Sequence, residues 1–192
     1  MDTEPAQWEV REDASRAVLA ALYLRTALGI REPAALPPLR GVPAAAAPAD
    51  EELEAQWQQF WQMTVEPEAH PADVPLDLVD GFGTLVALPR TAEVLRRAAA
   101  PLAVDAVAYA EEAHRRAQLP EGDAAAWRNA VRDEERTRGR DSSAFLLKVE
   151  ILPLEQRGAW WIGGLTIAVT DGLRSDVAAF GRTIRPFVAD VF

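Results

Sequence analysis

The sequence predicts an α+β protein that is mostly helical, with a small antiparallel sheet formed by a C-terminal β-hairpin and a helix that covers it. Apolar residues recur every three or four positions in most segments, and they alternate with polar residues around position 150. Prolines and glycines separate these segments. We expect one compact domain overall, with an N-terminal helix and Pro/Ala-rich arm over residues 1–49 and the α+β domain over residues 50–192.

The first helix is expected over residues 8–28, with Gly29 as its C-terminal stop. Five prolines then follow within residues 33–49, which excludes a continuous helix or a central strand. We interpret this stretch as a connector or an extended arm on the surface. A proline-rich ligand for a small recognition domain is the alternative interpretation.

Asp50 is expected to cap the next helix, because the acidic residues after it suit the positive end of a helix. Leu53, Trp57, Phe60 and Trp61 then lie three or four positions apart and form one aromatic stripe. We predict that this stripe is the core side of the helix, since a helix must bury one face. A partner-binding or base-stacking face is the alternative.

A loop rich in proline and acidic residues is expected over residues 64–82, and a short strand over residues 83–88. His70 lies among several acids there, including Asp77 and Asp80. Oxygen-rich loops with a histidine bind divalent cations, so these three residues are the candidate metal ligands. A solvated acidic loop is the alternative, because the regular spacing of a calcium-binding loop is missing.

Three helices are expected next, over residues 91–100, 101–119 and 124–138. The predicted hairpin joins an alternating run, residues 145–154, to an aromatic and branched run, residues 160–170. Alternation places Lys148 and Glu150 together on a partly solvated face, and Gly163-Gly164 suggests a bulge or the close approach of another backbone. A final helix from Leu173, limited or kinked by Pro186, is expected to cover the hairpin.

Charge and composition bear on the possible partners. The net charge of −10 and the pI near 4.7 oppose binding to phosphate backbones and anionic lipids, so no nucleic acid or membrane is expected as a partner. The chain has no cysteine, which excludes disulfides and thiolate chemistry. Residues 1–10 lack the basic start and apolar run of a signal peptide, so a cytoplasmic location is expected.

Motifs that carry chemistry are few. Glu111 and His114 form one Glu-x-x-His pair, whereas di-iron bundles need two such pairs and further carboxylates, so a solvated helix face is favoured. The sequence contains no phosphate-binding loop, dinucleotide fingerprint or Gly-x-Ser-x-Gly turn. No cofactor is therefore expected.

These observations favour a non-enzymatic protein-interaction module that binds itself as a homodimer or binds another protein. The candidate partner-binding residues are the aromatics of the predicted hairpin and of the apolar tail, namely Trp160, Trp161, Phe187 and Phe192. The alternative is a small-molecule or metal-dependent binding protein, or a hydrolase, that uses the acidic loop over residues 66–80.

Overall fold

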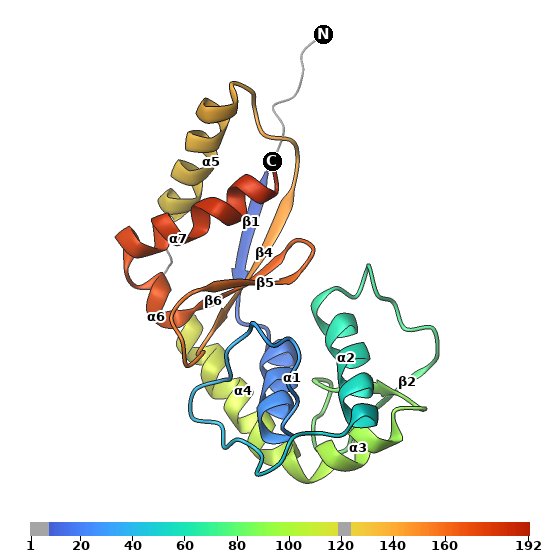
Figure 1. Ribbon diagram of the computed structural model, residues 1–192. Helices are drawn as coiled ribbons and strands as arrows, with labels where there is room; N and C mark the ends of the chain where they lie inside the picture. Colours follow the sequence, from blue (N-terminus) through green and yellow to red (C-terminus); the bar gives the residue numbers. More distant parts are fainter. Residues whose placement is uncertain (1–7, 119–123) are drawn as a thin grey trace.

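The computed structural model describes residues 8–118 and 124–192, whose helices and two sheets form an α+β fold (Figure 1). Most of the segment compared with a signal peptide, and the last residue expected in the helix over 101–119, lie outside these described residues. In chain order the elements are β1 (Glu9–Asp13), α1 (Arg16–Ala27), α2 (Glu51–Val65), β2 (Leu76–Leu78), β3 (Ala87–Pro89), α3 (Glu93–Ala99), the 3-10 turn η1 (Ala100–Leu102), α4 (Ala103–Ala117), α5 (Ala124–Arg138), β4 (Leu146–Leu152), β5 (Ala159–Gly163), β6 (Thr166–Thr170), α6 (Asp171–Arg174) and α7 (Val177–Asp190).

The larger sheet is mixed, not antiparallel, with the strand order β1-β4-β6-β5. β4 runs parallel to both β1 and β6, and β5 runs antiparallel to β6. The predicted antiparallel hairpin of residues 145–154 with 160–170 is therefore wrong: β4 and β6 of these two runs do pair, but in parallel, and the hairpin lies inside the second run, between β5 and β6. Residues of β6 are all buried and those of β5 are half-buried, so β6 takes the central position and β5 the edge.

The hairpin turn passes through Gly164 and Leu165, and the pairing of β5 with β6 is irregular between Trp161 and Gly163, as expected of a bulge. The group that approaches these glycines is the side chain of Glu66, just after α2, and not a backbone as expected. The amide of Gly164 donates to Oε1 of Glu66 at 2.5 Å, and a Cβ on Gly163 would lie 2.6 Å from Cδ of Glu66. The turn is therefore attached to the end of α2.

The first helix begins later than expected. Residues 9–13 form β1, and α1 starts at Arg16, after the side chain of Ser15 accepts a hydrogen bond from the amide of Val18. Pairing with β4, far along the chain, turns residues 9–13 into a strand. At the other end Gly29 stops α1 as predicted, with φ +71°, and a side chain there would meet the carbonyl of Ala47.

Alternate side chains of the sheet enter two different hydrophobic clusters. Leu147, Val149 and Ile151 of β4 pack with α5 and α7, whereas Leu152 packs in the larger cluster with α1, α2 and α4. As expected, the last helix covers one face of the sheet. Pro186 lies inside α7, which continues to Asp190.

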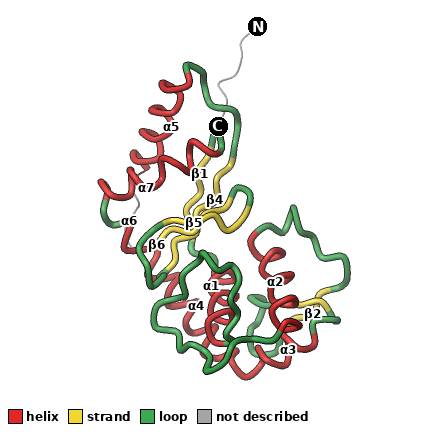
Figure 2. The backbone as a smooth tube through the Cα atoms, viewed as in Figure 1, coloured by secondary structure: helices red, strands yellow, loops and turns green. Residues whose placement is uncertain are grey.

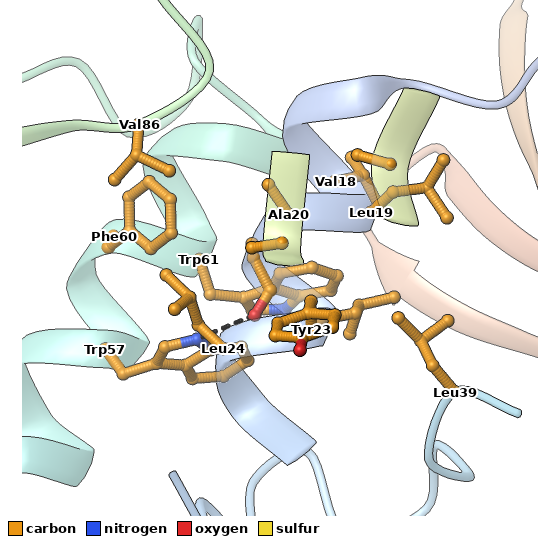
Figure 3. Packing of buried hydrophobic residues seen from close by; sticks show 14 of the residues in the cluster. Val18, Leu19, Ala20, Tyr23, Leu24, Leu39, Trp57, Phe60, Trp61 and Val86 are labelled. Carbon is orange, nitrogen blue, oxygen red and sulfur yellow. Dashed lines mark hydrogen bonds between the residues drawn. The ribbon is translucent and has the colours of Figure 1, made fainter. Parts of the chain in front are cut away.

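The larger cluster surrounds α1, which is buried along most of its length (Figure 3). Trp57 of α2 is wholly buried against it, and its indole nitrogen donates to the carbonyl of Ala21 at 3.1 Å. The rings of Trp57 and Trp61 stack with centroids 5.4 Å apart, and Phe60 is buried beside them. The prediction that the aromatic stripe is the core side of its helix is confirmed.

The Pro-rich stretch after α1 lies against the rest of the molecule as a long loop (Figure 2). Leu39 forms an isolated antiparallel bridge with Leu154, just beyond β4. The buried guanidinium of Arg25, 6% exposed, donates to four carbonyls of the stretch, those of Arg31, Glu32, Pro33 and Pro37. The division of the chain at residue 49 stays a prediction.

The segment expected to be an acidic loop contains β2, which pairs with β3 in a separate two-stranded antiparallel sheet. The strand expected over residues 83–88 therefore exists but begins at Ala87. Of the helices in the described ranges, none has the length and apolar character needed to cross a membrane.

Candidate functional site

The parallel strands β1, β4 and β6 end at the same edge of the sheet, and ligands of open sheets with parallel strands bind at this carboxyl edge. A cavity of about 340 Å³ lies there, between the strand ends, α4 and the Pro-rich stretch. This volume falls within the range of about 300–1,000 Å³ that is typical of small-molecule sites. The edge cavity is lined by Arg40, Gly41, Tyr109, Glu112, Ala113, Arg116, Ala117, Pro153 and Asp171.

One face of α4 forms the helical wall of the edge cavity. Tyr109, Glu112, Ala113 and Arg116 are spaced three or four residues apart, so the helix presents them on the same side. The alanine leaves space between the longer side chains. The wall therefore combines a polar ring and two charges with a small apolar patch.

Arg40 joins the Pro-rich stretch to the ends of two strands. Its amide donates to the carbonyl of Pro153 at 2.8 Å, directly after β4. Its guanidinium contacts Oδ2 of Asp171 at 2.5 Å, directly after β6. The hydroxyl of Tyr109 donates to the carbonyl of Arg40 at 2.9 Å, which links this corner to α4. These bonds hold the Pro-rich stretch in place over the edge cavity.

The pKa of Tyr109 is raised to about 12, mainly by burial and to a smaller extent by the Asp171 carboxylate, while Arg40 and Arg116 oppose the rise. The phenol therefore stays protonated at physiological pH and serves as a hydrogen-bond donor, not as a base. The ring of Tyr23 lies 5.6 Å away and supports it from α1.

The other charges of the edge cavity occur as two ion pairs. Arg116 contacts Glu112 at 2.7 Å on α4, and Arg40 contacts Asp171 at the strand ends. Serine, cysteine and histidine are missing from the lining that the described residues provide. Exposed ion pairs beside a protonated phenol suit the recognition of a charged or polar molecule.

The three candidate metal ligands do not form one cluster among the described residues. His70 contacts Glu66 at 3.9 Å, whereas Asp77 contacts Arg90 at 3.0 Å in the small sheet. Across the described ranges, no group of three or more histidine, aspartate or glutamate residues is placed to hold a metal ion. Asp77 and Asp80 instead line a surface hollow of about 560 Å³ with arginines of and near α3. This hollow is more open than the edge cavity, and its Asp77–Arg90 pair is largely exposed.

The four candidate partner-binding aromatics are half-buried and contact other parts of the molecule. The ring of Trp161 lies 5.3 Å from that of Phe187, and its indole nitrogen donates to Asp190 at 3.3 Å. Phe192 lies 6.4 Å from Phe145. Trp160, on the other face of the sheet, packs against the larger hydrophobic cluster. Their role in partner binding stays a prediction.

The Glu-x-x-His pair has structural partners. Glu111 contacts Arg16 at 2.9 Å, and Nδ1 of His114 lies 2.7 Å from the carbonyl of Ala14, which makes it the donor in that bond. Nε2 of His114 lies 3.0 Å from the side-chain amide of Gln118. Nδ1 thus joins the residue after β1 to α4, and Nε2 contacts the residue that ends α4.

Glu150 is a titratable residue whose burial the sequence pattern underestimated. It shares a face with the half-buried Lys148 as predicted, but it is itself buried, and its Oε2 accepts from the amide of Ser15 at 2.7 Å. Burial raises the pKa of Glu150 to about 7; Asp13 adds to the rise, and the Ser15 bond, Lys148 and His114 oppose it.

Sequence analysis did not single out Arg40, Tyr109 or Asp171 as site residues. The sequence signals that could have indicated the site were the tyrosine at position 109, which lies among alanines, and the aspartate at position 171, directly after the run expected to be a strand. No protein-family model matches the chain, and comparisons with curated proteins and with solved structures found no match. Function is therefore inferred from the geometry of the edge cavity.

Proposed function

We propose that this protein binds a small polar molecule in the edge cavity without catalysing a reaction on it. The observation that carries the proposal is the convergence of the protonated Tyr109 and two Arg–carboxylate pairs on one enclosed space at the carboxyl edge of the sheet. The alanines and Pro153 add apolar surface, as is usual in small-molecule sites.

A thermal-shift screen with a library of polar metabolites tests this proposal. A compound present at 100 times its Kd adds about 2.7 kcal/mol to the free energy of unfolding, which raises the Tm of a chain of this length by roughly 5–10 °C. Ala113→Leu fills the edge cavity and is expected to abolish the shift. The control Val104→Leu changes a residue of the same helix that is 78% exposed and outside the cavity, so it keeps the shift.

Circular dichroism verifies that both variants fold. If Ala113→Leu does not fold, Arg116→Gln, at an exposed position of the cavity wall, takes its place. A compound that stabilises the wild type and the cavity variant equally binds elsewhere and contradicts the proposal. So does a screen without any stabilising compound, combined with native mass spectra that show no bound small molecule on protein purified from its own host.

A second candidate function is protein binding through an exposed apolar edge, with a second copy of the chain as the first partner to test. Val74, Leu76 and Leu78 are 41%, 41% and 58% exposed. Leu76 and Leu78 lie two residues apart and share one face of β2, and Val74 lies in the bend just before this strand. Within the described part of the chain, β2 pairs only with β3, and a free strand edge of this kind favours pairing with another chain.

Sedimentation velocity over a range of protein concentrations tests self-association through this apolar edge. The wild type is expected to form dimers as the concentration rises. Leu78→Glu is expected to remain a monomer, because it places a negative charge in the apolar edge that would be buried between two copies. Val104→Glu is the matched control, since Val104 is more exposed but lies outside the apolar edge. A wild type that stays monomeric, or a control that also loses the dimer, contradicts self-association at this site.

A further inference from the structure

The edge cavity carries equal numbers of positive and negative groups. Arg40 and Asp171 form one pair at the strand ends, and Arg116 and Glu112 form the other on α4. Arg40, Asp171 and Arg116 all act on the pKa of Tyr109, so three of these four charges lie around the same phenol. The edge cavity is therefore neutral as a whole but strongly dipolar.

Both ion pairs are available to a ligand. Side-chain exposure is 57% and 38% for Arg40 and Asp171, and 74% and 43% for Arg116 and Glu112. Pairs this exposed are worth little, so an entering charged group can replace one partner at small cost. Glu112 also contacts Arg115 at 2.5 Å, so it keeps an opposite charge when Arg116 turns to a ligand carboxylate. A ligand that also carries an ammonium group matches the carboxylate of Asp171 at the strand ends, so a molecule with both signs contacts one charge of each pair.

Tyr109 adds an acceptor to the edge cavity. Its hydroxyl hydrogen is committed to the carbonyl of Arg40. A phenol that donates its hydrogen retains oxygen lone pairs that accept from a donor such as ammonium. Asp171 lies close enough to act on this phenol, so the two together suit a cationic amine. The guanidinium of Arg116, on the same helix face, suits a carboxylate.

We infer that the edge cavity takes a small zwitterion, a molecule with an ammonium and a carboxylate group such as a free amino acid or a short peptide. This inference rests on the proposed function and specifies its ligand. The ammonium lies against Asp171 and Tyr109, and the carboxylate lies against Arg116. Ala113, Ala117 and Pro153 provide apolar lining that suits an aliphatic side chain. The volume of about 340 Å³ is near the lower end for ligand sites, which favours one or two amino-acid units.

Isothermal titration calorimetry with matched probes tests the inference. L-Leucine is compared with N-acetyl-L-leucine, which lacks the ammonium, and with L-leucinamide, which lacks the carboxylate. L-Leucine is expected to bind, and its two derivatives are expected to bind at least about tenfold more weakly than L-leucine, the equivalent of about 1.4 kcal/mol. L-Valine and L-alanine, each with its own acetylated and amide derivatives, extend the comparison to smaller side chains. An acetylated derivative that binds as tightly as its parent overturns the inference in favour of an anion site. An absence of binding by all three amino acids at millimolar concentration also overturns it.

Asp171→Asn locates the ammonium group. The variant keeps an oxygen that accepts from the amide of Gly172, as Asp171 does at 2.7 Å, so the local fold is retained. It is expected to weaken amino-acid binding about tenfold or more, whereas Arg90→Gln, at an ion pair distant from the edge cavity, leaves binding unchanged. Equal binding by wild type and Asp171→Asn overturns the inference. If a compound that is not a zwitterion stabilises the protein and loses its effect in Ala113→Leu, the zwitterion inference fails while the proposed function stands.

Discussion

Replacing Trp57 by alanine is expected to lower the free energy of unfolding by about 3–5 kcal/mol. Trp57 is wholly buried between α2 and α1, so its loss removes the contacts of a large ring and leaves a cavity. It also leaves the carbonyl of Ala21 without the indole donor at 3.1 Å. A loss of this size is a large share of the stability of a typical domain.

Chemical denaturation followed by far-UV circular dichroism measures this effect without relying on tryptophan fluorescence. Trp57→Phe, which keeps a ring but loses the hydrogen bond, is expected to fall between the wild type and Trp57→Ala. Val104→Ala is the exposed control and is expected to change the free energy of unfolding by less than about 0.5 kcal/mol. A Trp57→Ala effect as small as that of the control would contradict the central place of α2 in the core.

The second large effect is a dependence of stability on pH that comes from Glu150. Its pKa is about 7 in the folded protein and near the ordinary value of 4.5 in the unfolded chain. Between these values the folded protein holds more protons than the unfolded chain, so stability falls as the pH rises through this range. A difference of about 2.5 in pKa, at about 1.4 kcal/mol each, corresponds to roughly 3 kcal/mol lost by pH 8.

Glu150→Gln removes this titration but keeps a side-chain oxygen for the amide of Ser15. The stability of the variant relative to the wild type is therefore expected to rise between pH 4.5 and pH 8, by up to about 3 kcal/mol. Measuring the difference between the two proteins at each pH removes the contributions of Asp13, Lys148 and His114 that both share. Glu155→Gln, in an exposed turn, serves as the control. A difference that is constant with pH would show that Glu150 does not titrate in this range.

Features that depend on neighbouring residues could be predicted from the sequence. Asp50 caps α2 as expected, with its carboxylate accepting from the amide of Leu53 at 2.8 Å, and Gly29 ends α1. The extent of α5 agrees with the expected helix over residues 124–138. The aromatic stripe of α2 is buried as predicted, because an amphipathic helix has one face that water disfavours.

The candidate site shows where local patterns fail. Arg40, Tyr109 and Asp171 come from a loop, a helix and a strand end that lie far apart in the chain, so no spacing rule joins them. The alternation in β4 correctly placed Lys148 and Glu150 on one face. The burial of Glu150 depends on its contact with Ser15 at the start of α1, which is not visible in that alternation.

The sequence by itself determined the α+β class, the approximate positions of the main helices, the cap at Asp50, the stop at Gly29 and the side of α2 that is buried. The tertiary structure alone decided that β1, β4 and β6 are parallel and that a cavity lies at the edge where these three strands end. It also decided that the hairpin lies between β5 and β6. The physical reason is the range of the interactions. Helices and caps depend on residues a few positions apart, whereas strand pairing and cavity walls depend on which buried surfaces meet across the whole chain.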